Sequence, residues 1–142
     1  MEVKKYKLLL VNPVNHLAKG FVCDPSTSYM PLGLGIIAAL TPDHWEIEFV
    51  DESFEEFTFR PADLIGLTAF TANAVRAYEI AAMYREKGIH TVMGGIHASM
   101  MTDEVREYVD TVISGEAETV WPVFLKDFEA GTPKVHYDGG VT

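Results

Sequence analysis

The stretch VMGGIHASMM, residues 92 to 101, brings two glycines and a titratable ring together directly after a short β-branched run. Gly94 and Gly95 carry no side chain, so a bulky ligand can approach the backbone there. His97 could act as a base or a ligand, provided that the fold supplies a partner group. The segment therefore predicts either a ligand-binding strand end or a site of acid-base chemistry.

Two other stretches have the same character. Thr68-Ala69-Phe70-Thr71 and Ser114-Gly115-Glu116 each follow a short apolar run. Small, neutral, hydrogen-bonding residues suit a large ligand that lies flat against the backbone, and they do not suit a compact charged substrate held by arginines. These strand ends thus favour a large ligand.

Short apolar runs alternate with helical patterns along the whole chain. Strands are predicted at 6–12, 45–50, 63–68, 90–93 and 111–113. Helices are predicted at 31–40, 72–87, 102–108 and 118–129. This alternation predicts an α/β fold of the flavodoxin-like or Rossmann-like type, a doubly wound parallel five-stranded sheet in the order 2-1-3-4-5 with helices on both faces. Ligands of such sheets bind outside the carboxyl ends of the strands, here residues 12–20, 68–73, 94–99 and 114–116.

The run over 45–50 has a different pattern from the other strands. Trp45, Ile47 and Phe49 alternate with the intervening residues, a period of two that is typical of an outer strand with one wet face. We therefore expect this strand at an edge of the sheet, with those three side chains facing the core.

Composition and charge limit the class of partner. The chain has 142 residues, 48% of them hydrophobic, enough for one domain with a sizeable core. A net charge of -10 argues against nucleic acid or an anionic membrane surface, since both need a basic face. No apolar run approaches the roughly 18 residues of a membrane span. The single cysteine, Cys23, allows no internal disulfide and suggests a reducing, cytoplasmic location.

Two known site patterns, a dinucleotide-binding fingerprint and the phosphoacceptor site of a receiver domain, do not match this chain at the positions where they function. Gly33 to Ala38 matches the dinucleotide fingerprint G-x-G-x-x-A, and Asp51 lies where a ribose-binding acid would be. However, about twenty residues separate Asn12 from Gly33, so these glycines are expected inside a helix and not at the turn after the first strand. A receiver domain would need aspartates where Asn12 and Thr68 stand, so a phosphoacceptor role is close to excluded.

Four stretches in order carry a more specific resemblance. They are LLVNP (9–13), MPLGL (30–34), GGIHAS (94–99) and SGEAE (114–118). Together they resemble the cobalamin-binding domain that precedes the catalytic barrel in many radical S-adenosylmethionine enzymes, a class that includes methyltransferases and cyclases. The resemblance covers the chain to about residue 130.

The resemblance implies a site for the nucleotide tail of cobalamin. In the wider fold this tail lies in a slot between sheet and helices, lined by Ser-x-Leu after the third strand and Gly-Gly after the fourth. Those places correspond here to Thr68-Ala69-Phe70 and to Gly94-Gly95. The implied cofactor-binding residues are Asn12, Pro13, Thr68, Ala69, Phe70, Thr71, Gly94, Gly95, His97, Gly115 and Glu116.

The chain departs from the methionine-synthase type of cobalamin domain after the first strand. That type has Asp-x-His-x-x-Gly, whose histidine binds cobalt and whose aspartate supports the histidine. Here His16 lies in the right region, Val14 replaces the aspartate, and Gly20 comes one residue late. Cobalamin domains attached to radical S-adenosylmethionine enzymes commonly lack the motif. His16 is thus a candidate cobalt ligand or an exposed loop histidine.

The same resemblance limits what the chain can do alone. Radical S-adenosylmethionine chemistry needs three cysteines in Cys-x-x-x-Cys-x-x-Cys to hold a 4Fe-4S cluster, and only Cys23 is present. S-adenosylmethionine and the cluster are therefore expected in a missing C-terminal domain of the same polypeptide. We expect a cobalamin-binding domain over 1–130, a linker over 131–142, and a role in presenting the corrinoid as a methyl carrier to that catalytic domain.

Other interpretations remain open from the sequence. The chain could be a stand-alone Rossmann-like binding or regulatory module without cobalamin, or a small hydrolase or transferase with His97 or His16 as base. No serine or cysteine nucleophile motif accompanies either histidine, which argues against the latter. Gly94 and Gly95 could simply allow a sharp turn, His97 could cap the helix that begins near Thr102, and Glu116 could favour the start of the last helix.

Overall fold

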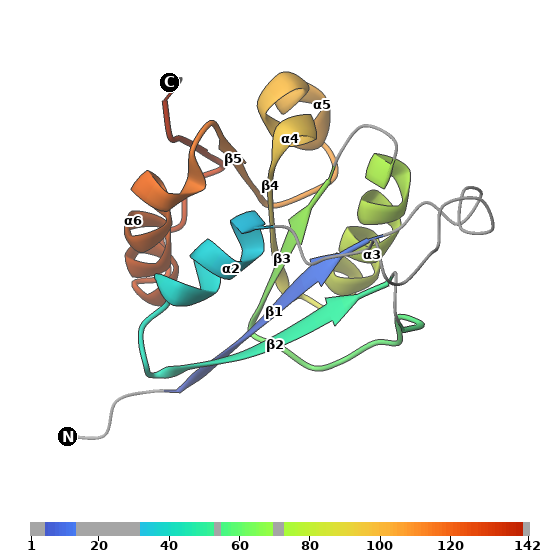
Figure 1. Ribbon diagram of the computed structural model, residues 1–142, viewed down its shortest axis with the longest axis horizontal. Helices are drawn as coiled ribbons and strands as arrows, with labels where there is room; N and C mark the ends of the chain where they lie inside the picture. The colour runs from blue at the N-terminus through green and yellow to red at the C-terminus, as the bar shows by residue number, and fades with distance from the viewer. Residues whose placement is uncertain (1–4, 14–31, 53–54, 70–72, 141–142) are drawn as a thin grey trace.

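A computed structural model describes residues 5–13, 32–52, 55–69 and 73–140, and its centre is one parallel sheet (Figure 1). The strands of the described residues are β1 (Tyr6–Asn12), β2 (Trp45–Asp51), β3 (Leu64–Thr68), β4 (His90–Gly94), β5 (Thr111–Ser114) and β6 (His136–Asp138). Their order is β2-β1-β3-β4-β5-β6, and every neighbouring pair is parallel. The predicted doubly wound order 2-1-3-4-5 is confirmed, with a sixth strand added beyond β5.

Helices cover both faces of the sheet. The helices α2 (Leu32–Ala39) and α6 (Ala117–Glu129) lie on one face, and α3 (Ala74–Glu86) lies on the other (Figure 1). Side chains of a strand alternate between the faces, so β1 sends Leu8 and Leu10 toward α2 and α6 and sends Leu9 and Val11 toward α3. Gly33 and Gly35 lie inside α2, as expected, which removes the dinucleotide fingerprint from the turn where it would function.

The outer strand β2 confirms its edge position but corrects the predicted pattern. Trp45 is buried and stacks on Tyr6 with ring centroids 4.7 Å apart, whereas Phe49 is 36% exposed and Val50 is buried. The three side chains expected to face the core, Trp45, Ile47 and Phe49, become progressively more exposed along the strand. The core under α2 ends before Phe49, and Val50 instead packs into the core on the α3 face.

The segment after β4 is more ordered than predicted. It forms the short helix α4 (Ile96–Met100), followed by α5 (Thr102–Val105), where the sequence predicts a loop and then a helix over 102–108. Five residues are too few to show a helical period, so the pattern contained no signal for α4. The helix follows Gly95 directly and lies near the carboxyl end of β4 (Figure 1).

The segment after α6 is not only a linker. The glycine and proline content predicts a linker over 131–142, but β6 pairs with β5 there, and Tyr137 is 5% exposed. The hydroxyl of Tyr137 donates a hydrogen bond to Asp127 Oδ2 at 2.6 Å. A strand of three residues with one buried side chain gives no readable alternation, so only the long-range pairing reveals it. The sheet therefore continues past residue 130.

Candidate functional site

A cavity of about 270 Å³ lies between the sheet and the helices α2 and α6. Its floor consists of strand residues whose side chains point to that face, and its walls come from the two helices. The floor includes Leu10, Gly66, Val92 and Ile113, the walls include Gly33, Leu34, Ile37, Ala117 and Trp121, and the rim includes Thr68, Gly94, Gly95, Gly115 and Glu116. We call this cavity the slot. It reaches the carboxyl ends of β3, β4 and β5, the edge where ligands of such sheets bind.

Gly94 leaves open a volume that any other residue would fill. It lies on the same face as Val92, two residues earlier, and pairs in register with Thr68 of β3. A Cβ added at Gly94 would be 3.7 Å from the backbone oxygen of Ile113 and 3.9 Å from its Cβ, which is ordinary contact. A side chain would thus be tolerated by the protein and would project into the slot.

Gly95 is required for a different reason. Its φ of 102° lies in the left-handed region, and an added Cβ would be 2.7 Å from Thr68 Oγ1. The turn after β4 and the turn after β3 are therefore in close contact. The sharp turn that the glycine pair could allow is observed at Gly95, whereas Gly94 leaves open volume in the slot.

Thr68 places a hydroxyl at the mouth of the slot. Leu64, Gly66 and Thr68 alternate onto the slot face of β3, and the first of them belongs to the core beneath α2 and α6. Among the described residues, the Thr68 hydroxyl makes no hydrogen bond. It is available to donate to, or accept from, a ligand in the slot.

The turn after β5 forms the far rim. Gly115 has a φ of 71°, and a side chain there would overlap the backbone of Gly140. Its N–H donates to Ser99 Oγ at 2.9 Å, which ties this turn to α4. Glu116 precedes α6 as its N-cap residue without a side-chain capping bond, so its carboxylate is not committed to the helix start.

Several slot residues were not predicted. Gly66 lies inside a buried strand, and its added Cβ would be 2.8 Å from Leu10 Cδ2, so the missing side chain leaves room for Leu10 in the floor. An isolated glycine within a strand pattern is a signal for close approach and could have identified it. Leu34, Ile37 and Trp121 carry no such signal, because their apolar types are those of ordinary core residues.

The imidazole of His97 lies away from the slot. It is 3% exposed and belongs to the face covered by α3. Its Nε2 is 2.7 Å from the hydroxyl of Tyr78 and 3.1 Å from Glu104 Oε2, and the Tyr78 hydroxyl donates to the same oxygen at 2.7 Å. Burial and the nearby Glu104 raise the pKa of Tyr78, and the hydrogen bond from Tyr78 lowers the pKa of Glu104. The structure therefore does not bring His97 together with the slot, and His97 does not cap α5.

The remaining predicted residues lie beside the slot or outside the described part. The amide of Asn12 donates to Asp51 Oδ1 at 3.3 Å, and the carbonyl of Pro13 accepts from Asn73 Nδ2 at 2.8 Å. Ala69 is buried, and its carbonyl accepts from the His97 N–H at 3.1 Å. None of these three lines the slot. Phe70, Thr71 and His16 lie outside the described residues.

The described part of the chain contains neither a cluster of metal-binding side chains nor a membrane-spanning helix. Over 5–13, 32–52, 55–69 and 73–140, no three histidine, cysteine, aspartate or glutamate side chains gather as a metal site would require. Within the same ranges no helix is both long enough and apolar enough to cross a bilayer.

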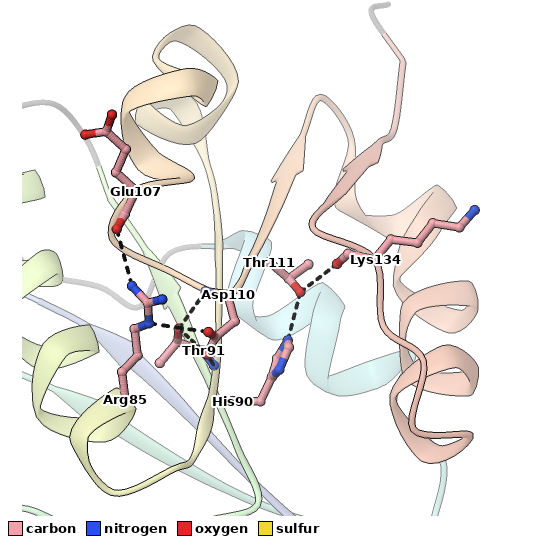
Figure 2. Close-up of polar contacts among 7 residues, drawn as sticks. All are labelled: Arg85, His90, Thr91, Glu107, Asp110, Thr111 and Lys134. Atoms are coloured by element: carbon pink, nitrogen blue, oxygen red, sulfur yellow. Dashed lines mark hydrogen bonds and ion pairs between the residues drawn. The ribbon is translucent and has the colours of Figure 1, made fainter.

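A second polar cluster lies at the amino ends of β4 and β5, opposite to the carboxyl ends that form the rim of the slot (Figure 2). Asp110 accepts from the N–H and the hydroxyl of Thr91 at 2.9 and 3.1 Å and pairs with Arg85 Nε at 3.3 Å. The Thr111 hydroxyl donates to the Lys134 carbonyl at 2.9 Å and lies 2.8 Å from His90 Nε2. These groups are hydrogen-bonded to one another, so the cluster connects the two strands.

The described residues form a doubly wound sheet with a slot at the edge where ligands of such sheets bind. Residues 22–125 match the family model described as B12 binding domain. The chain belongs to this family. The resemblance to cobalamin-binding domains that the four sequence stretches predict is thereby confirmed.

Curated proteins similar to this chain are methyltransferases. Bacteriochlorophyllide d C-8(2)-methyltransferase of Chlorobaculum tepidum is 36% identical over 81% of this chain, and bacteriochlorophyllide d C-12(1)-methyltransferase of the same organism is 32% identical over 92%. An uncharacterized methyltransferase of Pyrococcus horikoshii is 29% identical over 91%. The matches span only 27%, 29% and 31% of these relatives, so the B12-binding chain corresponds to less than a third of each.

Proposed function

We propose that this domain binds a corrinoid with the nucleotide tail in the slot and presents it to a radical S-adenosylmethionine catalytic domain of the same polypeptide. The reaction that we favour is methyl transfer, because the similar curated proteins are methyltransferases. A cyclase remains the other reaction that the resemblance implies. The S-adenosylmethionine and the 4Fe-4S cluster would belong to the catalytic domain, and the location would be cytoplasmic.

The size and lining of the slot support the proposal. An engineered apolar cavity of about 150 Å³ holds benzene, so a slot of about 270 Å³ has room for a larger, bicyclic aromatic base. Its floor and walls are apolar, as such a ring requires. The observation that carries the proposal is the open volume at Gly94, which the protein leaves unfilled although a Cβ would fit there.

The residues of the slot would make different contacts with the corrinoid. The hydroxyl of Thr68 would hydrogen-bond a ring nitrogen of the tail, while Leu34, Ile37 and Trp121 would exclude water from the ring faces. Gly94 would let the tail lie against the backbone of the strands. When bound, the corrinoid supplies a cobalt that can carry a methyl group, and the chain contributes orientation and exclusion of water.

Corrinoid retention by the whole chain tests the proposal directly. Protein incubated with hydroxocobalamin and then desalted should keep the visible absorption of the corrinoid. A chain that retains no corrinoid spectrum would contradict the proposal and would favour a binding or regulatory module without cobalamin.

The variant Gly94→Val tests the placement of the tail. Its side chain would occupy the slot without contacting the protein closely, so we expect loss of corrinoid retention with a similar thermal denaturation midpoint. The matched control is Gly35→Val, because an added Cβ at Gly35 meets no atom within 4 Å and this residue lies outside the slot lining. Normal retention by Gly94→Val would show that the tail binds elsewhere.

A further inference from the structure

The short helix α4 contacts all three turns that border the slot. The N–H of His97 donates to the carbonyl of Ala69, after β3, at 3.1 Å. The hydroxyl of Ser99 donates to the carbonyl of Gly95, after β4, at 3.0 Å and accepts from the N–H of Gly115, after β5, at 2.9 Å. The position of this one helix therefore determines how far apart the three turns stand.

The side chain of His97 anchors α4 from the opposite side of the sheet. Its Nε2 contacts both the Tyr78 hydroxyl of α3 and the Glu104 carboxylate of α5. The single hydroxyl hydrogen of Tyr78 goes to Glu104, and the carboxylate has no hydrogen to give, so His97 Nε2 carries the hydrogen that both oxygens accept. Tyr78 also stacks on Tyr108 with ring centroids 4.0 Å apart. The three polar groups thus form one hydrogen-bonded network.

We propose that His97, Tyr78 and Glu104 are positioning residues of the corrinoid slot, which hold α4 so that the turns at Thr68 and Gly95 keep the separation that the nucleotide tail needs. This inference rests on the proposed function. The turns after β3 and β4 are packed closely against each other, because an added Cβ at Gly95 would be only 2.7 Å from Thr68 Oγ1. A small shift of α4 therefore changes the shape of the slot.

Two tyrosines of α3 provide a matched pair for the test. Tyr84 lies on the same helix and in the same core, and its hydroxyl donates to the Arg60 carbonyl at 2.8 Å and accepts from the Arg60 N–H at 3.1 Å. It makes no contact with α4 among the described hydrogen bonds. Tyr78→Phe and Tyr84→Phe each remove one hydroxyl that takes part in two hydrogen bonds, so we expect both to lose thermal stability.

Only Tyr78→Phe should weaken the binding of hydroxocobalamin, by about fivefold, when the folded fractions are equal. His97→Gln, which keeps a hydrogen-bond donor, should bind more tightly than His97→Ala. Equal affinity of Tyr78→Phe and Tyr84→Phe would overturn the inference and leave the proposed function intact. If the wild-type chain itself bound no corrinoid, both would fail.

Ser99→Ala provides a second variant in case Tyr78→Phe does not fold. Ser99 is exposed, and its loss removes the tie between α4 and Gly115 without opening the core. We expect weaker hydroxocobalamin binding with an unchanged thermal midpoint, and an unchanged affinity would overturn the role of α4.

Discussion

His90 is a partly buried histidine whose protonation opposes folding. It begins β4, and its Nε2 lies 2.8 Å from the Thr111 hydroxyl (Figure 2). Since that hydroxyl gives its hydrogen to Lys134, Nε2 must be the donor, which defines the tautomer of the neutral ring. Burial lowers the pKa of His90 below its ordinary value of 6.5, although the charge of Asp110 acts in the other direction.

The lowered pKa of His90 predicts a loss of stability at mildly acid pH. The folded state favours the neutral ring, so the unfolded state binds more protons below pH 6.5. The contribution of the neutral His90 ring to stability is fully present above pH 6.5 and is lost as the pH falls through the pKa of His90 in the folded state. Urea denaturation at pH 7.5 and 5.5 measures the free energy of unfolding at each pH. This free energy should decrease less between the two pH values in His90→Gln than in the wild type. Equal decreases would show that His90 does not cause the effect.

The end of β2 is attached to α3 by a buried ion pair. Glu52 follows β2 and is 1% exposed, and its carboxylate accepts three contacts of 2.8 to 3.2 Å from the guanidinium of Arg76. Arg76 also contacts Glu79, one turn along α3, at 3.1 Å. Removing one partner of such a pair deprives the buried charge of that partner's compensation, which is strongly destabilising.

We expect Arg76→Met to lower the free energy of unfolding by about 3 kcal/mol, because Glu52 would remain buried without its partner. Arg60→Met is the control, since Arg60 pairs with the partly exposed Glu48 and should cost about 1 kcal/mol or less. Chemical denaturation measures both values. A cost for Arg76→Met no larger than that for Arg60→Met would contradict a structural role of the buried pair.

At the level of the whole molecule, β6 decides how far the domain extends. Tyr137 is packed against the core beneath α2 and α6, and its hydroxyl also accepts from the Lys134 N–H at 2.9 Å. Gly139 N–H donates to the Ser114 carbonyl at 2.7 Å, so this segment continues along the rim of the slot. We propose that the folded domain reaches at least residue 138.

Tyr137→Ala tests this boundary. The loss of a buried aromatic ring should lower the free energy of unfolding by about 3 kcal/mol. Val135→Ala, at a position that is 49% exposed, should change it by about 0.5 kcal/mol or less. A negligible effect of Tyr137→Ala would show that residues after 130 form only a linker.

Sequence patterns predicted the fold and the rim of the slot because both depend on local signals. Short apolar runs and, for β2, a period of two identified the first five strands, and the rule for parallel sheets then placed Thr68, Gly94, Gly95, Gly115 and Glu116 along one edge. The patterns missed α4 and β6, which are too short for a period, and they misplaced Phe49, whose exposure depends on where the α2 core ends.

The sequence by itself determined the alternation of strands and helices, the family resemblance, and the absence of side chains at the strand ends, because residue type and spacing encode these directly. Only the tertiary structure decided on which face of the sheet each side chain lies. Gly94 and His97 are three residues apart, yet the left-handed Gly95 between them sends one to the slot and the other to Tyr78 and Glu104. That direction depends on contacts with α3 and α5, which no local pattern reports.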